Sequence, residues 1–142
     1  MTRTAPARVL CDTSVVLPLL LADHATHDAA VHALRGRRAS IAGHAAFESF
    51  STLTRLPVPH RLPSALAHEL LVTEFDEMLW LTVEATQRLF ANLPSLGISG
   101  GAVYDALVAA CAVEHGLALL SADERAVPTY AALGASVELV GR

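Results

Sequence analysis

One carboxylate, Asp105, interrupts an otherwise apolar stretch that covers residues 100–113. On a helix that turns 100° per residue, the small side chains of Ala102, Ala109 and Ala112 flank Asp105 on its own face. A helix that is apolar all round is typical of a buried helix, and an ionised carboxylate inside it is costly unless a partner offsets its charge. The charge of Asp105 must therefore be offset either by a basic side chain of the protein or by a bound metal ion.

Basic side chains are scarce in this chain. Its 142 residues include ten arginines and no lysine, against 14 acidic residues, and the net charge is −4. This balance argues against a protein that holds nucleic acid on a broad basic surface. Local contacts to RNA phosphate are still open to Arg37, Arg38, Arg55 and Arg61, although scattered surface arginines are the more ordinary interpretation. An acidic protein that acts on RNA would need metal ions between its carboxylates and the phosphates.

The composition indicates one globular domain over residues 1–142, because 53% of the residues are apolar and 17% are charged. Cys11 and Cys111 lie in apolar runs, and two cysteines are too few for a disulfide scaffold or a zinc site. Asp12 and Pro18 interrupt the N-terminal apolar run, so neither export nor membrane spanning is expected. We expect a cytoplasmic protein with buried, reduced thiols.

Short apolar strands are predicted to alternate with helices. Strands are expected at residues 7–11, 40–42, 78–81, 117–120 and 137–140, with helices between them. The first helix should follow Asp12, with Thr13 and Ser14 able to cap it and Pro18 in or near its first turn. The helix from Val83 should end at Pro94, and the Asp105 helix at Gly116. In the helix at residues 44–55, the expected apolar face consists of Ala46, Phe47, Phe50 and Leu53; a further helix is expected from Ser64, as its cap, to about Phe75. This alternation predicts an α/β fold with a short parallel sheet of about four to five strands, covered on both faces.

Three acids are expected at one edge of that sheet. Asp12 and Asp123 each follow an apolar strand directly, and Asp105 opens the helix that leads into the strand at residues 117–120. Ligands gather beyond the carboxyl ends of the strands in open parallel sheets. Carboxylates that converge without basic partners repel one another, and a hard divalent cation removes that penalty. We therefore predict a Mg²⁺ site, with Mn²⁺ as a possible substitute.

Each acid also has a simpler interpretation. Asp12 could cap the helix that follows it, and Asp123 could be a turn residue. Glu48 lies opposite the apolar face of its helix, where a solvated acid is the ordinary expectation. Asp105 is harder to explain in this way, because its surroundings are apolar. The four acids taken together carry more weight than any one of them.

In order along the chain, these segments resemble the PIN domain, and within it the VapC-type toxins of toxin–antitoxin pairs. The resemblance rests on Val9-Leu10-Cys11-Asp12-Thr13-Ser14, Phe47-Glu48, Tyr104-Asp105-Ala106-Leu107-Val108-Ala109-Ala110-Cys111 and Leu119-Leu120-Ser121-Ala122-Asp123. No single motif is specific, but their order, spacing and total length fit across essentially the whole chain. The resemblance implies a PIN-like three-layer α/β/α sandwich.

The resemblance also implies a Mg²⁺-dependent endoribonuclease, the toxin of a type II pair. Asp12, Glu48, Asp105 and Asp123 correspond to the acids that bind the metal or support its ligands. Ser121 matches a hydroxyl residue, commonly Thr in the family, that would orient substrate or metal-bound water. The ion would lower the pKa of a bound water, which would attack the phosphate. The resemblance implies that the products carry a 5′-phosphate and a 3′-hydroxyl. The expected partners are an RNA substrate, a VapB-like antitoxin whose C-terminal segment enters the acidic crevice, and a second copy of the chain.

Other functions have weaker support. An RNA-processing nuclease without a toxin role would lack an adjacent reading frame for a small DNA-binding antitoxin. An inert PIN-like binding module would be free to lose the acids. A phosphohydrolase with Asp12 as nucleophile normally needs an acid two residues later, where this chain has Ser14. A dinucleotide site at residues 97–101 is rejected, because the preceding strand and the glycine spacing are absent.

Two further groups of side chains could form surface sites. The side chains His24, His27, Asp28 and His32 recur at helical spacing, and a polar helix face is favoured over a metal patch. A partner groove could form around the loop at residues 57–63 from Leu19, Leu20, Leu66, Leu70 and Leu71. Core packing explains those leucines equally well.

Overall fold

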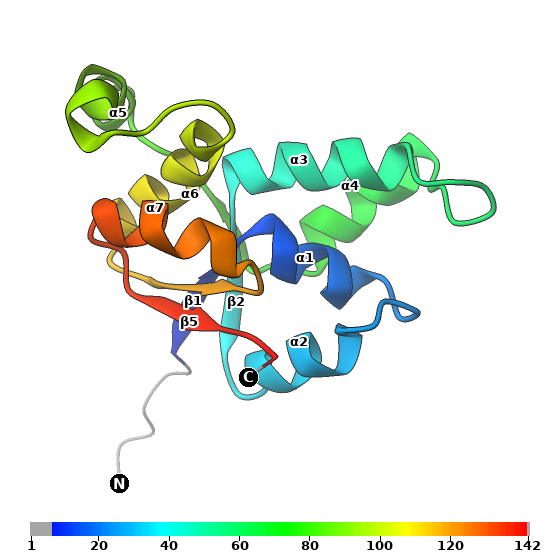
Figure 1. Cartoon of the computed structure of the whole chain (residues 1–142). Helices are drawn as coiled ribbons and strands as arrows, with labels where there is room; N and C mark the ends of the chain where they lie inside the picture. The colour runs from blue at the N-terminus through cyan, green and yellow to red at the C-terminus, as the bar shows by residue number, and fades with distance from the viewer. Residues whose placement is uncertain (1–6, 142) are drawn as a thin grey trace, which may run out of the picture.

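The computed structural model describes residues 7–141, and in that range five strands form one parallel sheet with seven α-helices around it (Figure 1). The strands are β1 (Arg8–Cys11), β2 (Arg38–Ala42), β3 (Glu77–Leu79), β4 (Ala118–Ser121) and β5 (Val137–Leu139). The α-helices are α1 (Thr13–Leu20), α2 (His27–Leu34), α3 (Gly43–Thr54), α4 (Ser64–Thr73), α5 (Val83–Leu96), α6 (Ala102–His115) and α7 (Val127–Ala132), and a short 3₁₀ helix, η1 (Glu124–Ala126), precedes α7. The predicted α/β fold with a parallel sheet is confirmed.

The strands are short, and the residues at the centre of the sheet are mostly apolar because helices bury them. Leu10, Ile41, Leu119 and Leu120 are fully buried at its centre. Cys11 and Cys111 are also buried, and neither forms a disulfide, as the sequence predicted. The central residues of the strands thus supply the core, while acids stand just beyond the ends of β1 and β4, at Asp12 and Asp123.

The strand order is β3-β2-β1-β4-β5, and it indicates which edge of the sheet is suited to bind a ligand. The chain adds β2 on one side of β1 and β4 on the other, so β1 and β4 flank the point where the order reverses. Ligands of open parallel sheets bind at such a point, beyond the carboxyl ends of the strands. Cys11 pairs with Leu120 there, so the residues that follow these two strands become neighbours.

Two prolines lie deeper in helices than predicted. Pro18 stands inside α1 rather than in its first turn, and α5 continues through Pro94 to end at Gly97, which has φ of 68°. A proline removes the backbone bond to the carbonyl four residues earlier. For Pro94 that carbonyl belongs to Phe90, which is exposed, so water can take the place of the missing N–H. Pro94 is therefore tolerated without ending α5.

The buried face of α3 agrees with the prediction at Ala46, Phe50 and Leu53 but not at Phe47. Phe47 is 68% exposed, whereas Ala45, Ala46, Ser49 and Leu53 face the core. Small residues at three of those positions allow the helix to pack closely on the sheet, and Phe47 lies outside that contact. Neither Ser64 nor Thr13 caps its helix through its side chain; both are the first residues of their helices.

Helix α6 ends at Gly116 as predicted, with φ of 65°. It is not buried on every side, however, since Tyr104 is 55% exposed and Val113 is 48% exposed. Helices α3, α5 and α7 contact α6, and they leave Tyr104 near its start and Val113 near its end accessible to solvent. Across residues 7–141, no helix has both the length and the apolar content required to cross a membrane.

Candidate functional site

A pocket of about 260 Å³ opens at the carboxyl ends of β1 and β4, and all four predicted acids line it. Asp12 follows β1, Asp123 follows β4, Glu48 comes from α3 and Asp105 from the first turn of α6. The remaining lining residues are Thr13, Ser14, Leu17, Val108 and Tyr130. The fold thus brings together acids that lie up to 111 positions apart (123 − 12). Their role as metal ligands stays a prediction.

Asp12 occupies the N-cap position of α1, but its side chain does not cap the helix. Its backbone carbonyl accepts hydrogen bonds from the amides of Val15 and Val16 at 3.1 and 3.0 Å. The carboxylate is therefore free for other contacts, although the residue is only 4% exposed. The simpler interpretation of Asp12 as a side-chain cap is wrong.

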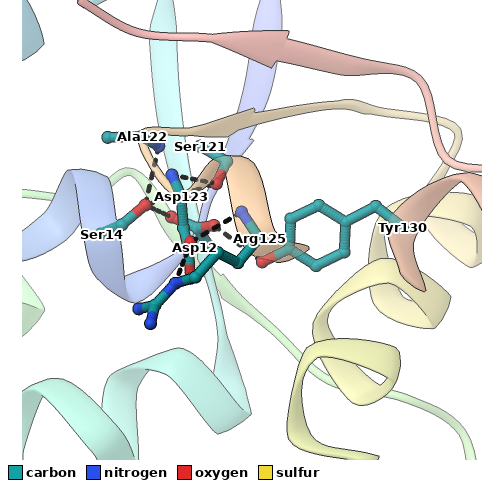
Figure 2. A network of polar contacts seen from close by, with 7 residues as sticks. All are labelled: Asp12, Ser14, Ser121, Ala122, Asp123, Arg125 and Tyr130. Atoms are coloured by element: carbon teal, nitrogen blue, oxygen red, sulfur yellow. Dashed lines mark hydrogen bonds and ion pairs between the residues drawn. The ribbon is translucent and has the colours of Figure 1, made fainter. Parts of the chain in front are cut away.

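Two hydroxyl groups hold the Asp12 carboxylate (Figure 2). Ser14 Oγ donates to Oδ1 at 2.5 Å, and Tyr130 OH donates to Oδ2 at 2.7 Å. The Ser14 hydroxyl also accepts the backbone N–H of Ala122 at 2.7 Å, which directs its own proton towards Asp12. Contacts from α1, β4 and α7 therefore fix both oxygens of one buried carboxylate.

The electrostatics of the pocket favour a cation. Burial raises the pKa of Asp12, and hydrogen bonds from Ser121, Ser14, Tyr130 and the Val15 backbone oppose that rise. Burial also raises the pKa of Asp105, and the charges of Asp123, Glu48 and Asp12 raise it further, while His44 partly offsets them. The acids thus destabilise one another's charged forms, as carboxylates do when they share a site without a counter-ion.

Asp123 has two roles in the structure. Its Oδ1 accepts the backbone N–H of Arg125 at 3.0 Å, which caps η1, so the predicted turn role is present. The same oxygen lies 3.5 Å from Arg125 Nε, but that arginine side chain is 94% exposed and such a pair contributes little. Asp123 can stabilise the turn and still face the pocket.

Glu48 is the most solvated of the four acids, with a side chain that is 44% exposed. Its Oε1 lies 2.7 Å from His44 Nε2, at ion-pair distance but without hydrogen-bond direction. Its Oε2 accepts a long bond of 3.5 Å from Thr13 Oγ1. The helix pattern that predicted a solvated acid is partly correct, yet Glu48 also lines the pocket.

Ser121 lies behind the pocket wall and is fully buried. Its Oγ accepts the backbone N–H of Asp123 at 3.1 Å and lies 3.3 Å from Ser14 Oγ. The Ser121 hydroxyl thus contacts the residues at the ends of both strands: it accepts the backbone N–H of Asp123, and its hydrogen bond opposes the rise in the pKa of Asp12. The contact with substrate or metal-bound water expected for Ser121 stays a prediction.

The sequence patterns did not predict two residues of the pocket. Ser14 was expected to cap a helix and not to contact the Asp12 carboxylate, and Tyr130 was not among the expected site residues. Tyr130 is 1% exposed, and a buried tyrosine hydroxyl usually needs a polar partner. That rule indicates that a partner exists, but nothing in the sequence identifies Asp12, which lies 118 positions earlier.

The donors suit a hard cation. Within residues 7–141, no three His, Cys, Asp or Glu side chains lie close enough to form a closed metal cage. Mg²⁺ does not require such a cage, because it usually keeps several waters and binds one or two carboxylates directly. Carboxylate oxygens held in place by hydroxyl groups, in a pocket with excess negative charge, fit a partly hydrated Mg²⁺ or Mn²⁺. The other acids could then bind its waters.

The raised pKa values predict how stability depends on pH. Because the folded-state pKa of Asp12 and Asp105 lies above the ordinary 3.8, folding favours their protonated forms. The contribution of these two protonated acids to the free energy of unfolding is present in acid, and it is lost as the pH rises from about 4 through the raised pKa values. Metal-free protein should therefore lose stability in that window relative to an Asp12→Asn, Asp105→Asn double variant, as measured by urea unfolding. Mg²⁺ should stabilise the unaltered protein more at pH 7.5 than at pH 5, and an equal effect at both would contradict this account.

The remaining predicted features do not form a second metal site. His27 Nδ1 lies 2.8 Å from the carbonyl of Pro18, and His24 Nδ1 accepts the N–H of Thr26 at 3.2 Å. Of the two interpretations of the five leucines, core packing fits better: Leu71 is buried in the core, and Leu66 alone of the five is exposed. A different apolar groove of about 360 Å³ lies between α3, α4 and β3, and it is lined by Ala46, Phe47, Phe50, His68, Leu71, Val72, Met78 and Trp80.

Comparisons with known proteins agree with one another and with the resemblance seen in the sequence. The family described as PIN domain matches residues 9–131. Ribonuclease VapC27 of Mycobacterium tuberculosis is 44% identical over 126 residues, which cover 89% of this chain and 92% of that protein. Two M. tuberculosis crystal structures share the fold. VapC20, a sarcin-ricin loop cleaving toxin, has a TM-score of 0.67 at 18% identity and coverage of 89% of this chain and 95% of that one. VapBC-5, of the VapBC family of toxin–antitoxin systems, has a TM-score of 0.58 at 23% identity and coverage of 95% and 98%.

Proposed function

This chain belongs to the PIN domain family, and we propose that it is a Mg²⁺-dependent endoribonuclease that acts as the toxin of a VapBC-like toxin–antitoxin pair. The observation that carries the proposal is the pocket in which Asp12, Glu48, Asp105 and Asp123 meet. These acids come from four separate parts of the chain, and the basic side chains that face them among residues 7–141 are the exposed Arg125, at Asp123, and the His44 ring, at Glu48. The similarity to a protein named as a ribonuclease supports RNA as the substrate.

The chain's own residues prepare the site for a metal ion and a phosphate. Ser14 and Tyr130 fix the Asp12 carboxylate by donating to its two oxygens, which leaves the remaining lone pairs for a cation. Asp105 would help to hold the ion, and Glu48 would orient its waters by accepting hydrogen bonds from them. When bound, the ion supplies an activated water and neutralises charge that develops on the scissile phosphate. The pocket contains no cysteine, and Ser14 is occupied by its contacts with Asp12 and Ala122, so water is the expected nucleophile.

The proposed partner is a VapB-like antitoxin, in line with the toxin–antitoxin name of VapBC-5. We expect its C-terminal segment to enter the acidic pocket, where a basic side chain could supply the missing positive charge. A homodimer and a cytoplasmic location belong to the same proposal. An adjacent reading frame for a short DNA-binding protein would favour the toxin role over an RNA-processing role without an antitoxin.

A cleavage assay tests the proposed activity. The purified chain, free of any partner, is incubated with defined RNAs in Mg²⁺ and then in excess EDTA. We expect cleavage only with the metal, with Mn²⁺ able to replace Mg²⁺, and products that carry a 5′-phosphate and a 3′-hydroxyl. Cleavage that persists at the same rate in EDTA would contradict the proposed mechanism.

A further inference from the structure

Ion pairs engage half of the arginines that the structure describes. The net charge of the chain is −4, and within residues 7–141 four of the eight arginines face carboxylates. These pairs are Arg8 with Glu77, Arg37 with Glu138, Arg38 with Asp76 and Arg125 with Asp123. Phosphate contacts normally supply most of the affinity of a nucleic-acid-binding protein. Contacts to RNA that do not depend on charge would therefore add to the affinity of this acidic protein.

Two aromatic rings stack beside the acidic pocket. The rings of His44 and Tyr104 lie parallel, with 3° between their planes and 5.2 Å between their centroids. His44 comes from the first turn of α3 and Tyr104 from the first turn of α6, two helices that contact each other (Figure 1). Although His44 covers one face of its ring, Tyr104 remains 55% exposed.

The stack is attached to the pocket at both ends. Tyr104 directly precedes Asp105, and His44 Nε2 lies 2.7 Å from Glu48 Oε1. Each ring is therefore linked to a different pocket acid, one through the backbone and one through a side-chain contact. A group stacked on Tyr104 would lie beside the site proposed to bind the scissile phosphate.

We propose that His44 and Tyr104 form a subsite that stacks one base of single-stranded RNA next to the acidic pocket. This inference rests on the proposed function and adds the substrate contact that the paired arginines do not provide. Every base has a flat π-face, so an exposed tyrosine ring can bind it whatever the sequence. His44 would keep the Tyr104 ring in a fixed orientation, so that less conformational entropy is lost on binding.

The test measures RNA binding without cleavage. Fluorescence anisotropy gives the Kd of the full chain in EDTA for a labelled 12-nucleotide RNA and for an abasic RNA backbone of equal length. Tyr104→Leu should weaken binding of the base-containing RNA by roughly 5- to 100-fold, the range expected for the loss of one stacked base. It should leave binding of the abasic backbone unchanged, and Tyr104→Phe, which keeps the ring, should restore the affinity. Phe90→Leu, which removes another exposed aromatic ring on α5, is the control and should bind as the unaltered chain does.

Two outcomes would overturn the subsite. In one, Tyr104→Leu binds both RNAs as tightly as the unaltered chain. In the other, it weakens both equally or changes the oligomeric state measured by light scattering, which would place Tyr104 in a different role. Failure of the nuclease proposal is separate, because it requires that the unaltered chain does not cleave RNA in Mg²⁺.

Discussion

Asp105→Asn is expected to lower the rate of RNA cleavage by more than about 100-fold, since loss of a residue that merely supports a metal ligand already costs roughly 10- to 100-fold. The substitution keeps the shape of the side chain but removes one of the charges that raise each other's pKa in the pocket. Cleavage should fall while the metal-free protein becomes no less stable, because like-charge repulsion is relieved. Single-turnover cleavage in saturating Mg²⁺ and urea unfolding in EDTA measure the two effects.

A fall in the cleavage rate without a fall in stability distinguishes a functional role of Asp105 from a structural one. Glu69→Gln, which removes an exposed acid on α4, is the matched control and should change neither rate nor stability appreciably. If Asp105→Asn cleaves RNA at an undiminished rate, Asp105 is not a ligand. If it loses activity only because it unfolds, the carboxylate has a structural role instead.

Tyr130→Phe is expected to weaken Mn²⁺ binding and RNA cleavage together, each by roughly 10- to 100-fold, as found for groups that orient metal ligands. The ring would still fill its buried position in α7, but Oδ2 of Asp12 would lose its 2.7 Å donor. The carboxylate could then rotate away from the position that suits the ion. Titration of Mn²⁺ followed by electron paramagnetic resonance measures the affinity without any contribution from catalysis.

A general loss of stability would not produce that result. Ser95→Ala removes an exposed hydroxyl on α5 and serves as the control. If Tyr130→Phe binds Mn²⁺ as the unaltered protein does and only its melting temperature falls, then Tyr130 contributes packing and does not position Asp12.

The positions of Asp12 and Asp123 could be predicted because topology determines them. Both acids follow continuously apolar strands, and parallel strands end at a common edge. Glu48 could not be found in that way, since its helix pattern is that of a solvated acid and its side chain is indeed 44% exposed. Only the resemblance to the PIN domain identified it. Tyr130 was missed because its contact with Asp12 joins residues 118 positions apart and depends on how α7 packs in the domain, which no local pattern encodes. Ser14 stands only two residues after Asp12, but a serine at the start of a helix is an ordinary capping residue, so its contact with the carboxylate does not stand out in the sequence.

The errors in the fold also have physical causes. The prediction that Pro94 ends α5 assumed that a missing backbone bond stops a helix, but solvent at the exposed Phe90 can replace that bond. Phe47 was predicted on the apolar face of its helix because it lies beside Ala46 and Phe50 on that face. In the structure, the small residues Ala45 and Ala46 pack against the core in its place. Helical periodicity indicates which residues share a face, but it does not show which face the rest of the protein covers.

The most direct test of the central claim is an anomalous difference map from crystals of the protein soaked in Mn²⁺. A pocket built to bind a divalent ion predicts a peak among Asp12, Glu48, Asp105 and Asp123, with at least one carboxylate oxygen at about 2.1–2.2 Å and water as the remaining ligands. An absent peak at saturating Mn²⁺, or a peak outside this pocket, would contradict the account.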